Sequence, residues 1–195
     1  SLALGLAIGE RLVVMGTSTG ATLALGLHAF PEAEDITAYI LLAPNFGPAD
    51  PASEFLTWPG GLQLARMVIG DQNRWEPANE LQERYWATAY PVEAMVEMMR
   101  LVKSVRGQLP FETRASMLAI YSPFDTVISI DRMREGFELI GSPNKRLHPL
   151  SDANNPGNPG MHVMAGNIMA PQNNEVLTEL VVEFVLKAEQ GKEES

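Results

Sequence analysis

The chain has 195 residues, which is long enough for one domain with its own core, and a formal net charge of −10. This charge argues against nucleic acid and against anionic membrane surfaces as partners, and no apolar run is long enough to span a membrane. Cysteine is absent and histidine occurs three times, so disulfides and thiolate sites are excluded and a multi-histidine metal site is disfavoured. We expect neither a metal nor a cofactor. The redox compartment cannot be inferred without cysteine, and our working expectation is a cytoplasmic protein.

The first part of the chain predicts a helix, a strand and a second helix. Residues 1–10 are typical of the end of an apolar helix, with a stop at Gly9. The run Leu12–Met15 is apolar without alternation, which suits a parallel strand covered on both faces. A Gly-Thr-Ser-Thr-Gly sequence breaks this run, and an Ala- and Leu-rich segment to about Phe30 predicts the next helix.

The Gly-x-Ser-x-Gly sequence between strand and helix matches a nucleophile elbow. A serine on such a strained turn has little space around its backbone, so its neighbours two residues away, Gly16 and Gly20, must lack bulk. The turn would place the Ser18 hydroxyl at the N-terminus of the following helix, where negative charge is stabilised. We expect the Thr19 N–H to be one oxyanion donor. A turn without any chemistry would leave the same local pattern.

The middle of the chain changes in character. Residues 36–43 predict a second buried strand, which is closed by residues 44–47. Residues 48–110 contain all three tryptophans, and prolines and glycines divide them into short helices, the longest at about Val92–Arg106. This stretch is too long for a simple crossover between strands. We therefore expect a helical cap at 48–110 and a core made of residues 1–47 and 111–195.

The cap supplies the candidate substrate pocket. Its aromatic and methionine side chains could form an adaptable apolar surface. The candidate pocket residues are Asn45, Phe46, Trp58, Met95 and Met99. The alternative is that these side chains only fill the interface between the cap and the sheet.

The last part of the chain alternates strands and helices. The expected elements are a strand at 114–121, a turn at 122–127, a helix at 130–140, a short strand at 145–150, an irregular loop at 151–160 and an amphipathic helix at 175–188, with Asn173 or Asn174 as its cap. The charged tail after Lys187 is expected to fray.

An activated serine needs a base, and the base needs an orienting carboxylate. Asp125 at a strand end and His162 in a loop follow Ser18 in the chain order of the α/β-hydrolase triad. Asp125 could instead cap a turn or a helix, and Asp152 is a second candidate acid because it shares the loop of His162.

Two other histidines could serve as the base. His28 lies near the end of the helix that follows the elbow, away from Ser18, and is more typical of an ordinary helix residue. His148 lies in a strand-like segment before a proline and is less free to reach over the sheet. His162, between the last strand and the last helix, is the better candidate.

The three motifs together resemble the α/β-hydrolase superfamily. They are Gly-Thr-Ser-Thr-Gly after a strand, Tyr-Ser-Pro-Phe-Asp-Thr-Val after a later strand and Met-His-Val-Met-Ala-Gly before the last helix. The resemblance covers nearly the whole chain and is closest to capped esterases of the lysophospholipase and serine-aminopeptidase-like type. It implies an α/β class fold, with a mostly parallel sheet flanked by helices and a cap insertion. It also implies hydrolysis of a small-molecule ester, with Ser18 as nucleophile, His162 as base and Asp125 orienting the imidazole. Amides and thioesters use the same serine chemistry.

One departure from the family pattern affects both structure and function. Family members carry several strands before the elbow, and a loop after an early strand supplies the second oxyanion donor. In this sequence only 17 residues precede Ser18. We therefore expect a partial α/β-hydrolase fold whose Leu12–Met15 strand has a bare apolar edge. A homodimer, or an N-terminal segment missing here, would cover that edge. Loss of one donor costs about 10²–10³ in rate. A non-catalytic binding or interaction module derived from a truncated hydrolase is therefore the alternative function.

Overall fold

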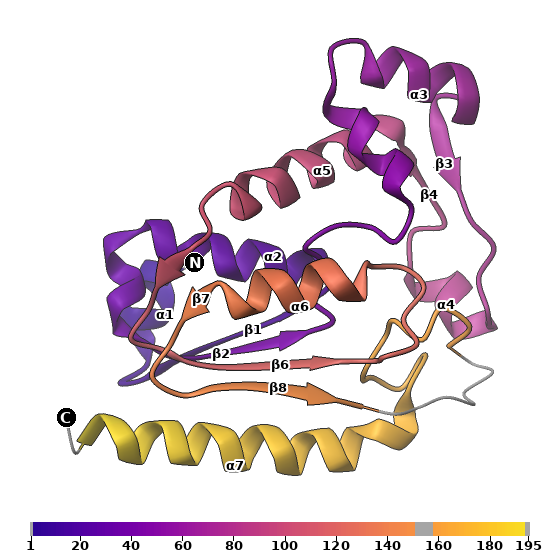
Figure 1. The fold of residues 1–195 in the computed structure, drawn as a ribbon. Helices are drawn as coiled ribbons and strands as arrows, with labels where there is room; N and C mark the ends of the chain where they lie inside the picture. Colours follow the sequence, from indigo (N-terminus) through magenta and orange to yellow (C-terminus); the bar gives the residue numbers. More distant parts are fainter. Residues whose placement is uncertain (1, 151–157, 194–195) are drawn as a thin grey trace.

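Four parallel strands form the central sheet, and Figure 1 shows their arrowheads at the same end. The computed structural model describes residues 2–150 and 158–193. Across the sheet the order is β1-β2-β6-β8. The strands are β1 (Leu12–Thr17), β2 (Ile36–Leu42), β6 (Ser116–Tyr121) and β8 (Lys145–Pro149). Because parallel strands end at one edge, the segments that follow β1, β2 and β6 meet there. The predicted α/β architecture with a parallel sheet is confirmed.

The inner strands and the edge strand differ in burial. Every residue of β2 and β6 is buried, because helices cover both faces of these strands. The register places Ile40 beside Leu118. In β1, Leu12–Val14 are only partly buried and Met15 is 56% exposed. The expectation that this strand is covered on both faces is therefore wrong in the described part of the chain, where β1 is the edge of the sheet.

Helices cover both faces of the sheet and complete three layers. Figure 1 shows α2, α5 and α6 on one face and α7 on the other. The α-helices are α1 (Leu2–Ile8), α2 (Thr19–Leu25), α3 (Gly61–Ile69), α4 (Glu80–Tyr85), α5 (Val92–Arg106), α6 (Ile130–Glu138) and α7 (Asn174–Glu193). The 3₁₀ helices are η1 (Gly26–Ala29), η2 (Pro31–Asp35), η3 (Pro51–Thr57) and η4 (Pro171–Asn173).

The last helix is longer than predicted. Its buried residues Leu177, Leu180 and Phe184 are spaced by three or four positions and form one stripe, and α7 contacts β2 and β6. The helix continues to Glu193, so the expectation that the tail frays after Lys187 is wrong. An ion pair of 3.5 Å between Glu189 and Arg11 connects this end of the helix to the start of β1.

Residues 48–110 carry an apolar cluster of their own, beside the main core. Its buried members are Leu56, Ala65, Val92, Val96 and Met99. α5 begins and ends where the sequence predicts, and Val105 near its end belongs to the main core. The purely helical prediction for this segment is incomplete, because β3 (Gln72–Arg74) pairs antiparallel with β4 (Ala89–Pro91). Strands of three residues are too short to show a periodic pattern.

Two smaller differences concern the core. The helix after the elbow ends at Leu25 and continues only as the 3₁₀ helix η1, whereas the sequence predicts it to about Phe30. A second parallel pair, β5 (Phe111–Glu112) with β7 (Ile140–Gly141), is also absent from the sequence prediction. Each of these strands has two residues, which again is below the length at which alternation can be recognised.

Glu54 joins the 48–110 segment to the core. Its carboxylate accepts two hydrogen bonds from Arg106 of α5, at 2.8 and 3.1 Å, and one from Arg132 of α6 at 2.5 Å. Lys103 adds an ion pair at 3.5 Å. The hydrogen bonds from Arg106, together with the charges of Arg106, Arg132 and Lys103, lower the pKa of Glu54 to about 2 against the opposing effect of burial. One carboxylate thus connects η3, α5 and α6.

Candidate active site

Ser18 occupies the turn between β1 and α2 in a strained conformation. Its φ is 54° and its ψ is −121°, a region that costs a residue with a side chain roughly 1–3 kcal/mol. The Ser18 N–H donates to Leu42 O at 2.8 Å, and Ser18 O accepts from the N–H groups of Ala21 and Thr22 at 3.0 and 3.2 Å. These bonds hold the serine at the carboxyl edge of the sheet, as expected for an elbow.

The two glycines of the elbow are not equivalent. A Cβ atom on Gly16 would lie 2.6 Å from the carbonyl oxygen of Gly20 and 2.7 Å from the nitrogen of Ala21, so only glycine fits there. A Cβ atom on Gly20 would meet no other atom of the described residues within 4 Å. Glycine was predicted to be required at both positions. The described residues require it at Gly16 but not at Gly20.

The structure brings His162 and Asp125 to Ser18. Asp125 lies after β6, and its Oδ1 accepts from the N–H groups of Val127 and Ile128 at 2.8 and 3.1 Å. Its Oδ2 lies 2.7 Å from His162 Nδ1, and His162 Nε2 lies 2.8 Å from Ser18 Oγ. With Nδ1 donating to the carboxylate, Nε2 is free to accept from the serine hydroxyl. The Asp125 side chain is fully buried and that of His162 is 13% exposed, so the bond between carboxylate and imidazole is shielded from water.

Asn158 holds the loop that carries His162. Its Nδ2 donates to Val163 O at 2.8 Å, its Oδ1 accepts from Val163 N at 3.4 Å, and its own backbone oxygen accepts from Met161 N at 2.9 Å. The residue is 2% exposed. The sequence analysis missed this role, because an asparagine in a loop rich in glycine and proline carries no signal beyond turn formation.

The two other histidines have different surroundings. His28 stacks on Phe111 with 3.7 Å between ring centres, and its Nδ1 lies 2.8 Å from Leu25 O at the end of α2. His148 lies in β8. Burial lowers the pKa of His148, and the nearby charge of Arg146 adds to this. Asp152 lies outside the described residues.

Thr19 and Asn45 lie beside the nucleophile. Thr19 is the first residue of α2, so its N–H has no acceptor inside the helix. Asn45 follows β2, and its N–H donates to Ser18 O at 3.3 Å. Its Oδ1 accepts from Gly47 N at 2.9 Å, which turns Nδ2 toward Thr19 Oγ1 at 3.4 Å. Asn45, which was expected to line the substrate pocket, thus lies beside the elbow.

The remaining predicted pocket residues occupy different surroundings. Phe46 is buried in the main core against Gly136 of α6. Met99 is buried in the second cluster, and Met95 lines a separate cavity of about 340 Å³. Trp58 is 58% exposed and packs edge-on against Phe55. The structure does not assemble these four residues into one pocket.

A different set of residues lines a cavity of about 440 Å³ beside His162. Seven of them come from the 48–110 segment, and we call the three aromatic ones, Trp75, Trp86 and Tyr90, the aromatic wall. Val127, Val163 and Met169 line the cavity as well. The presence of tryptophans in residues 48–110 was visible in the sequence. The sequence did not show which tryptophans face the triad, because the positions of Trp75 and Trp86 depend on the β3–β4 pairing and on α4.

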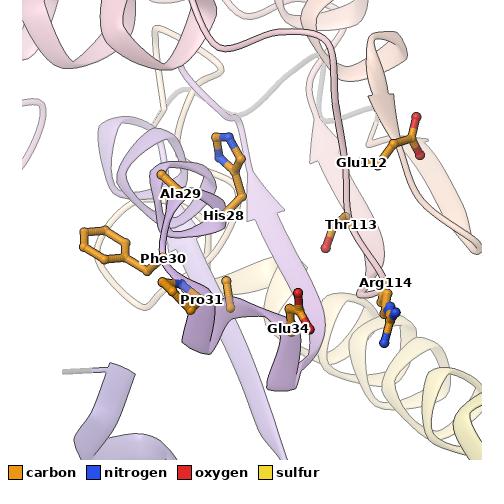
Figure 2. A pocket seen from close by; sticks show the side chains of 9 residues that line it. His28, Ala29, Phe30, Pro31, Glu34, Glu112, Thr113 and Arg114 are labelled. Atoms are coloured by element: carbon orange, nitrogen blue, oxygen red, sulfur yellow. The ribbon is translucent and has the colours of Figure 1, made fainter.

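The largest cavity described, of about 660 Å³, lies at the opposite end of the sheet. Its lining comes from η1, η2 and residues 112–114, which precede β2 and β6. Figure 2 shows His28, Phe30 and Glu34 on one side of this cavity and Glu112, Thr113 and Arg114 on the other. The Thr113 hydroxyl oxygen accepts from Ala115 N at 3.1 Å. Among the described lining residues no serine pairs with a histidine, so volume alone does not indicate the reactive centre.

Neither a metal-binding cluster nor a membrane-spanning helix occurs in the described part of the chain. Within residues 2–150 and 158–193, no group of three or more His, Cys, Asp or Glu side chains is arranged to hold a metal ion. In the same ranges no helix combines the length and the apolar character needed to cross a membrane.

Comparison with known proteins gives matches in structure. No protein-family model matches the sequence, and no curated protein sequence matches it significantly. A metagenome-derived lipolytic enzyme of the LipS and LipT pair matches with a TM-score of 0.70 and 16% identity, over 95% of this chain and 69% of the other. The monoglyceride lipase of Saccharomyces cerevisiae, solved with a substrate analogue, matches with a TM-score of 0.69 and 11% identity, over 96% of this chain and 65% of the other.

The monoacylglycerol lipase of Paleococcus ferrophilus is similar in the same way, with a TM-score of 0.64, 14% identity, and coverage of 95% of this chain and 72% of the other. This chain therefore spans between 65% and 72% of the length of these three enzymes. At such identities the similarity shows the fold. About 95% of this chain therefore corresponds to part of an α/β-hydrolase fold, as the motifs predict.

Proposed function

We propose that this protein hydrolyses carboxylic esters through an acyl-enzyme on Ser18. The observation that carries the proposal is the continuous chain of hydrogen bonds from Asp125 through His162 to Ser18, at 2.7 and 2.8 Å. A hydroxyl with a neutral imidazole at this distance, and a carboxylate behind the imidazole, has the parts of a serine nucleophile. The presence of lipases and esterases among the similar structures supports this reaction class.

The proposed reaction has two halves. Ser18 Oγ attacks the ester carbonyl carbon while its proton passes to His162 Nε2, and Asp125 stabilises the imidazolium that forms. The Thr19 N–H at the start of α2 donates to the oxyanion. The bond to the alcohol then breaks, and His162 returns the proton to the leaving oxygen. Water repeats the sequence on the acyl-enzyme and releases the acid.

We also propose that residues 1–47 and 111–195 form the hydrolase core and that residues 48–110 form a cap. The separate apolar cluster of the 48–110 segment supports this division. In Figure 1, α3, α4, β3 and β4 lie beyond the arrowheads of the sheet, at the end where Ser18 lies. The ion pair of Glu54 with Arg132 of α6 would then connect the cap to the core.

We propose that another strand covers the free edge of β1, supplied by a second copy or by a segment N-terminal to Ser1. Exposed apolar side chains surround this edge, including Leu4 at 63%, Met15 at 56% and Leu23 at 59%. An apolar edge strand readily pairs with further chain. Light scattering after size exclusion, with intact-mass analysis, tests this: a dimer or a longer chain is expected, and a lone monomer of this length would contradict it.

A fluorophosphonate probe tests the catalytic proposal. The probe should label the parent protein, and Ser18→Ala should abolish labelling and lower kcat/KM for p-nitrophenyl esters by about 10³ or more. Ser53→Ala is the matched control, because this serine lies in η3 away from the triad and its removal should change neither readout. Equal ester hydrolysis by parent and Ser18→Ala would refute the proposal.

The same experiment tests the competing function, a non-catalytic binding or interaction module. The observation that favours it is that Thr19 is the only oxyanion donor we identify among the described residues. Folded parent protein that fails to react with the probe would support that alternative.

A further inference from the structure

We propose that the cavity beside His162 binds the alcohol part of the ester, and that this alcohol carries an aromatic ring without a negative charge. The inference rests on the proposed ester hydrolysis and specifies its substrate class. Its basis is the position of the cavity relative to the triad and the chemistry of the aromatic wall.

The position of the cavity assigns it to the alcohol. The described residues that line it include His162 but neither Ser18 nor Thr19. The carbonyl oxygen of a bound ester must point toward Thr19 N, whereas the leaving oxygen must lie near His162 Nε2, which gives it a proton. A cavity that opens on the imidazole and not on the oxyanion donor therefore lies on the leaving-group side.

The aromatic wall determines the kind of alcohol. Trp75 and Trp86 lie edge to face, with ring centres 6.3 Å apart and planes at 70°. Trp86 is 39% exposed although it is large and apolar, so a ligand could still cover part of it. An aromatic ring gains binding free energy from such offset and edge contacts in addition to that from the burial of its apolar area. An alkyl chain gains only the contribution from burial. The volume of about 440 Å³ lies toward the lower end of small-molecule pockets.

The wall is held in place before any ligand binds. Asn73 and Tyr90 are register partners in the β3–β4 pair, and Asn73 Nδ2 donates to the Tyr90 hydroxyl at 2.8 Å. Trp75 N donates to Thr88 O at 3.1 Å, which extends the pairing. At the start of α4, Asn79 Nδ2 donates to Ile168 O at 3.0 Å, and this bond joins α4 to the segment after His162. A preformed aromatic surface loses little entropy when a flat ring binds.

Charge on the cavity rim disfavours a negatively charged ring. The Glu76 carboxylate lines the cavity, and no described residue forms an ion pair with it. The whole chain carries a net charge of −10. An alcohol with its own carboxylate would meet repulsion on entry, whereas an uncharged aromatic alcohol would not.

A series of acetate esters tests the proposal, because every member forms the same acetyl-enzyme and differs only in the alcohol. We expect kcat/KM for benzyl acetate and 2-naphthylmethyl acetate to exceed that for hexyl acetate by about tenfold. Trp75→Leu and Trp86→Leu should remove this preference. Tyr85→Leu should retain it, since Tyr85 neighbours Trp86 in sequence, is 63% exposed and does not line the cavity.

Two readouts separate this inference from the proposed function. Hydrolysis of p-nitrophenyl acetate and labelling of Ser18 report the function alone. Suppose that the protein hydrolyses p-nitrophenyl acetate and that Ser18 is labelled. The inference is then overturned, and the function stands, if hexyl acetate is the better substrate or if both tryptophan variants keep the preference for aromatic alcohols. If hydrolysis and labelling are both absent in folded protein, the function fails and the alcohol assignment fails with it.

Binding to Ser18→Ala protein gives a measurement that needs no catalysis. In saturation-transfer NMR, the ring protons of benzyl alcohol should receive saturation from this variant. The additional change Trp86→Phe, which keeps a ring at this position, should preserve the transfer, whereas Trp86→Leu should reduce it. Equal transfer in both variants would contradict a role of the aromatic wall in binding the ring.

Discussion

The two sides of the cavity beside His162 are built in different ways. Ser18 and Asp125 follow strands of six residues in the sheet, and backbone N–H groups hold Asp125 through its Oδ1. The aromatic wall stands on strands of three residues, and Trp86 at its end is 39% exposed. Proton transfer needs geometry within a fraction of an ångström, whereas apolar contact tolerates small movements. The triad thus rests on the sheet, whereas the proposed alcohol-binding surface rests on shorter elements outside it.

The largest expected effect breaks the rigid side. Asp125→Asn keeps an oxygen for the N–H groups of Val127 and Ile128 but places an NH₂ group against His162 Nδ1. The imidazole must then expose the wrong tautomer to Ser18, so we expect kcat/KM to fall by about 10³–10⁴-fold with little change in Tm. Steady-state kinetics and a melting curve measure both. The exposed Asp131→Asn is the control, and a loss of less than tenfold at Asp125 would contradict the assignment.

The second prediction compares the two glycines of the elbow. Gly16→Ala should lower the free energy of unfolding by about 2–4 kcal/mol, because its Cβ would lie 2.6 Å from Gly20 O. Gly20→Ala should leave stability unchanged or raise it by up to about 1 kcal/mol, since the position is helical and open. Urea unfolding measures both changes. Equal destabilisation would show that additional structure covers Gly20.

The third prediction concerns the junction between the 48–110 segment and the core. Glu54→Gln should lower the free energy of unfolding at pH 7 by about 1–2 kcal/mol, because the ion pairs of Glu54 are partly buried. The pKa of Glu54 is lowered from 4.5 to about 2, so its contribution is complete above pH 4.5 and is lost as the pH falls toward 2. The stability difference between parent and variant should vanish over that range.

Urea titrations at several pH values measure this difference. Glu97→Gln is the matched control, because Glu97 pairs with Arg100 on the exposed side of α5 and should change stability by less than about 0.5 kcal/mol. A difference for Glu54→Gln that persists at pH 2 would mean that the side chain contributes through packing rather than through charge.

The smallest effect concerns the rim of the aromatic wall. Glu76→Gln should raise kcat/KM for the acetate of 4-(hydroxymethyl)benzoate about two- to fivefold at low salt, because a repulsive charge is removed. Salt near 1 M should abolish the gain, since the screening length is then about 3 Å. Benzyl acetate serves as the neutral control. A gain that survives high salt would point to a steric cause.

The sequence could predict the features that rest on local patterns. Residues 36–42 and 92–106 show their structure as an apolar run and as an amphipathic period, and both elements lie where expected. The positions of Asp125 and His162 followed from strand ends and chain order, because parallel strands deliver their following turns to one edge. The structure places both within hydrogen-bonding distance of their partners.

Features that depend on distant contacts could not be predicted. Trp75 and Trp86 border the cavity only because β3 pairs with β4 and Asn79 bonds to Ile168. Trp58, with the same side chain, is exposed elsewhere. The role of Asn158 depends on the backbone of Val163, which has no signature in the sequence. A single sequence records which residues are apolar, but it does not record which apolar residues face one another.

The hydrogen bond between His162 and Ser18 joins residues 144 positions apart, and Asp125 comes from a third segment between them. A partly formed sheet would not hold all three side chains, so the proposed reactive serine would exist only in molecules that have folded to completion. The stoichiometry of covalent labelling at Ser18 would therefore count native molecules in a preparation, and its time course after dilution from urea would report the last step of folding.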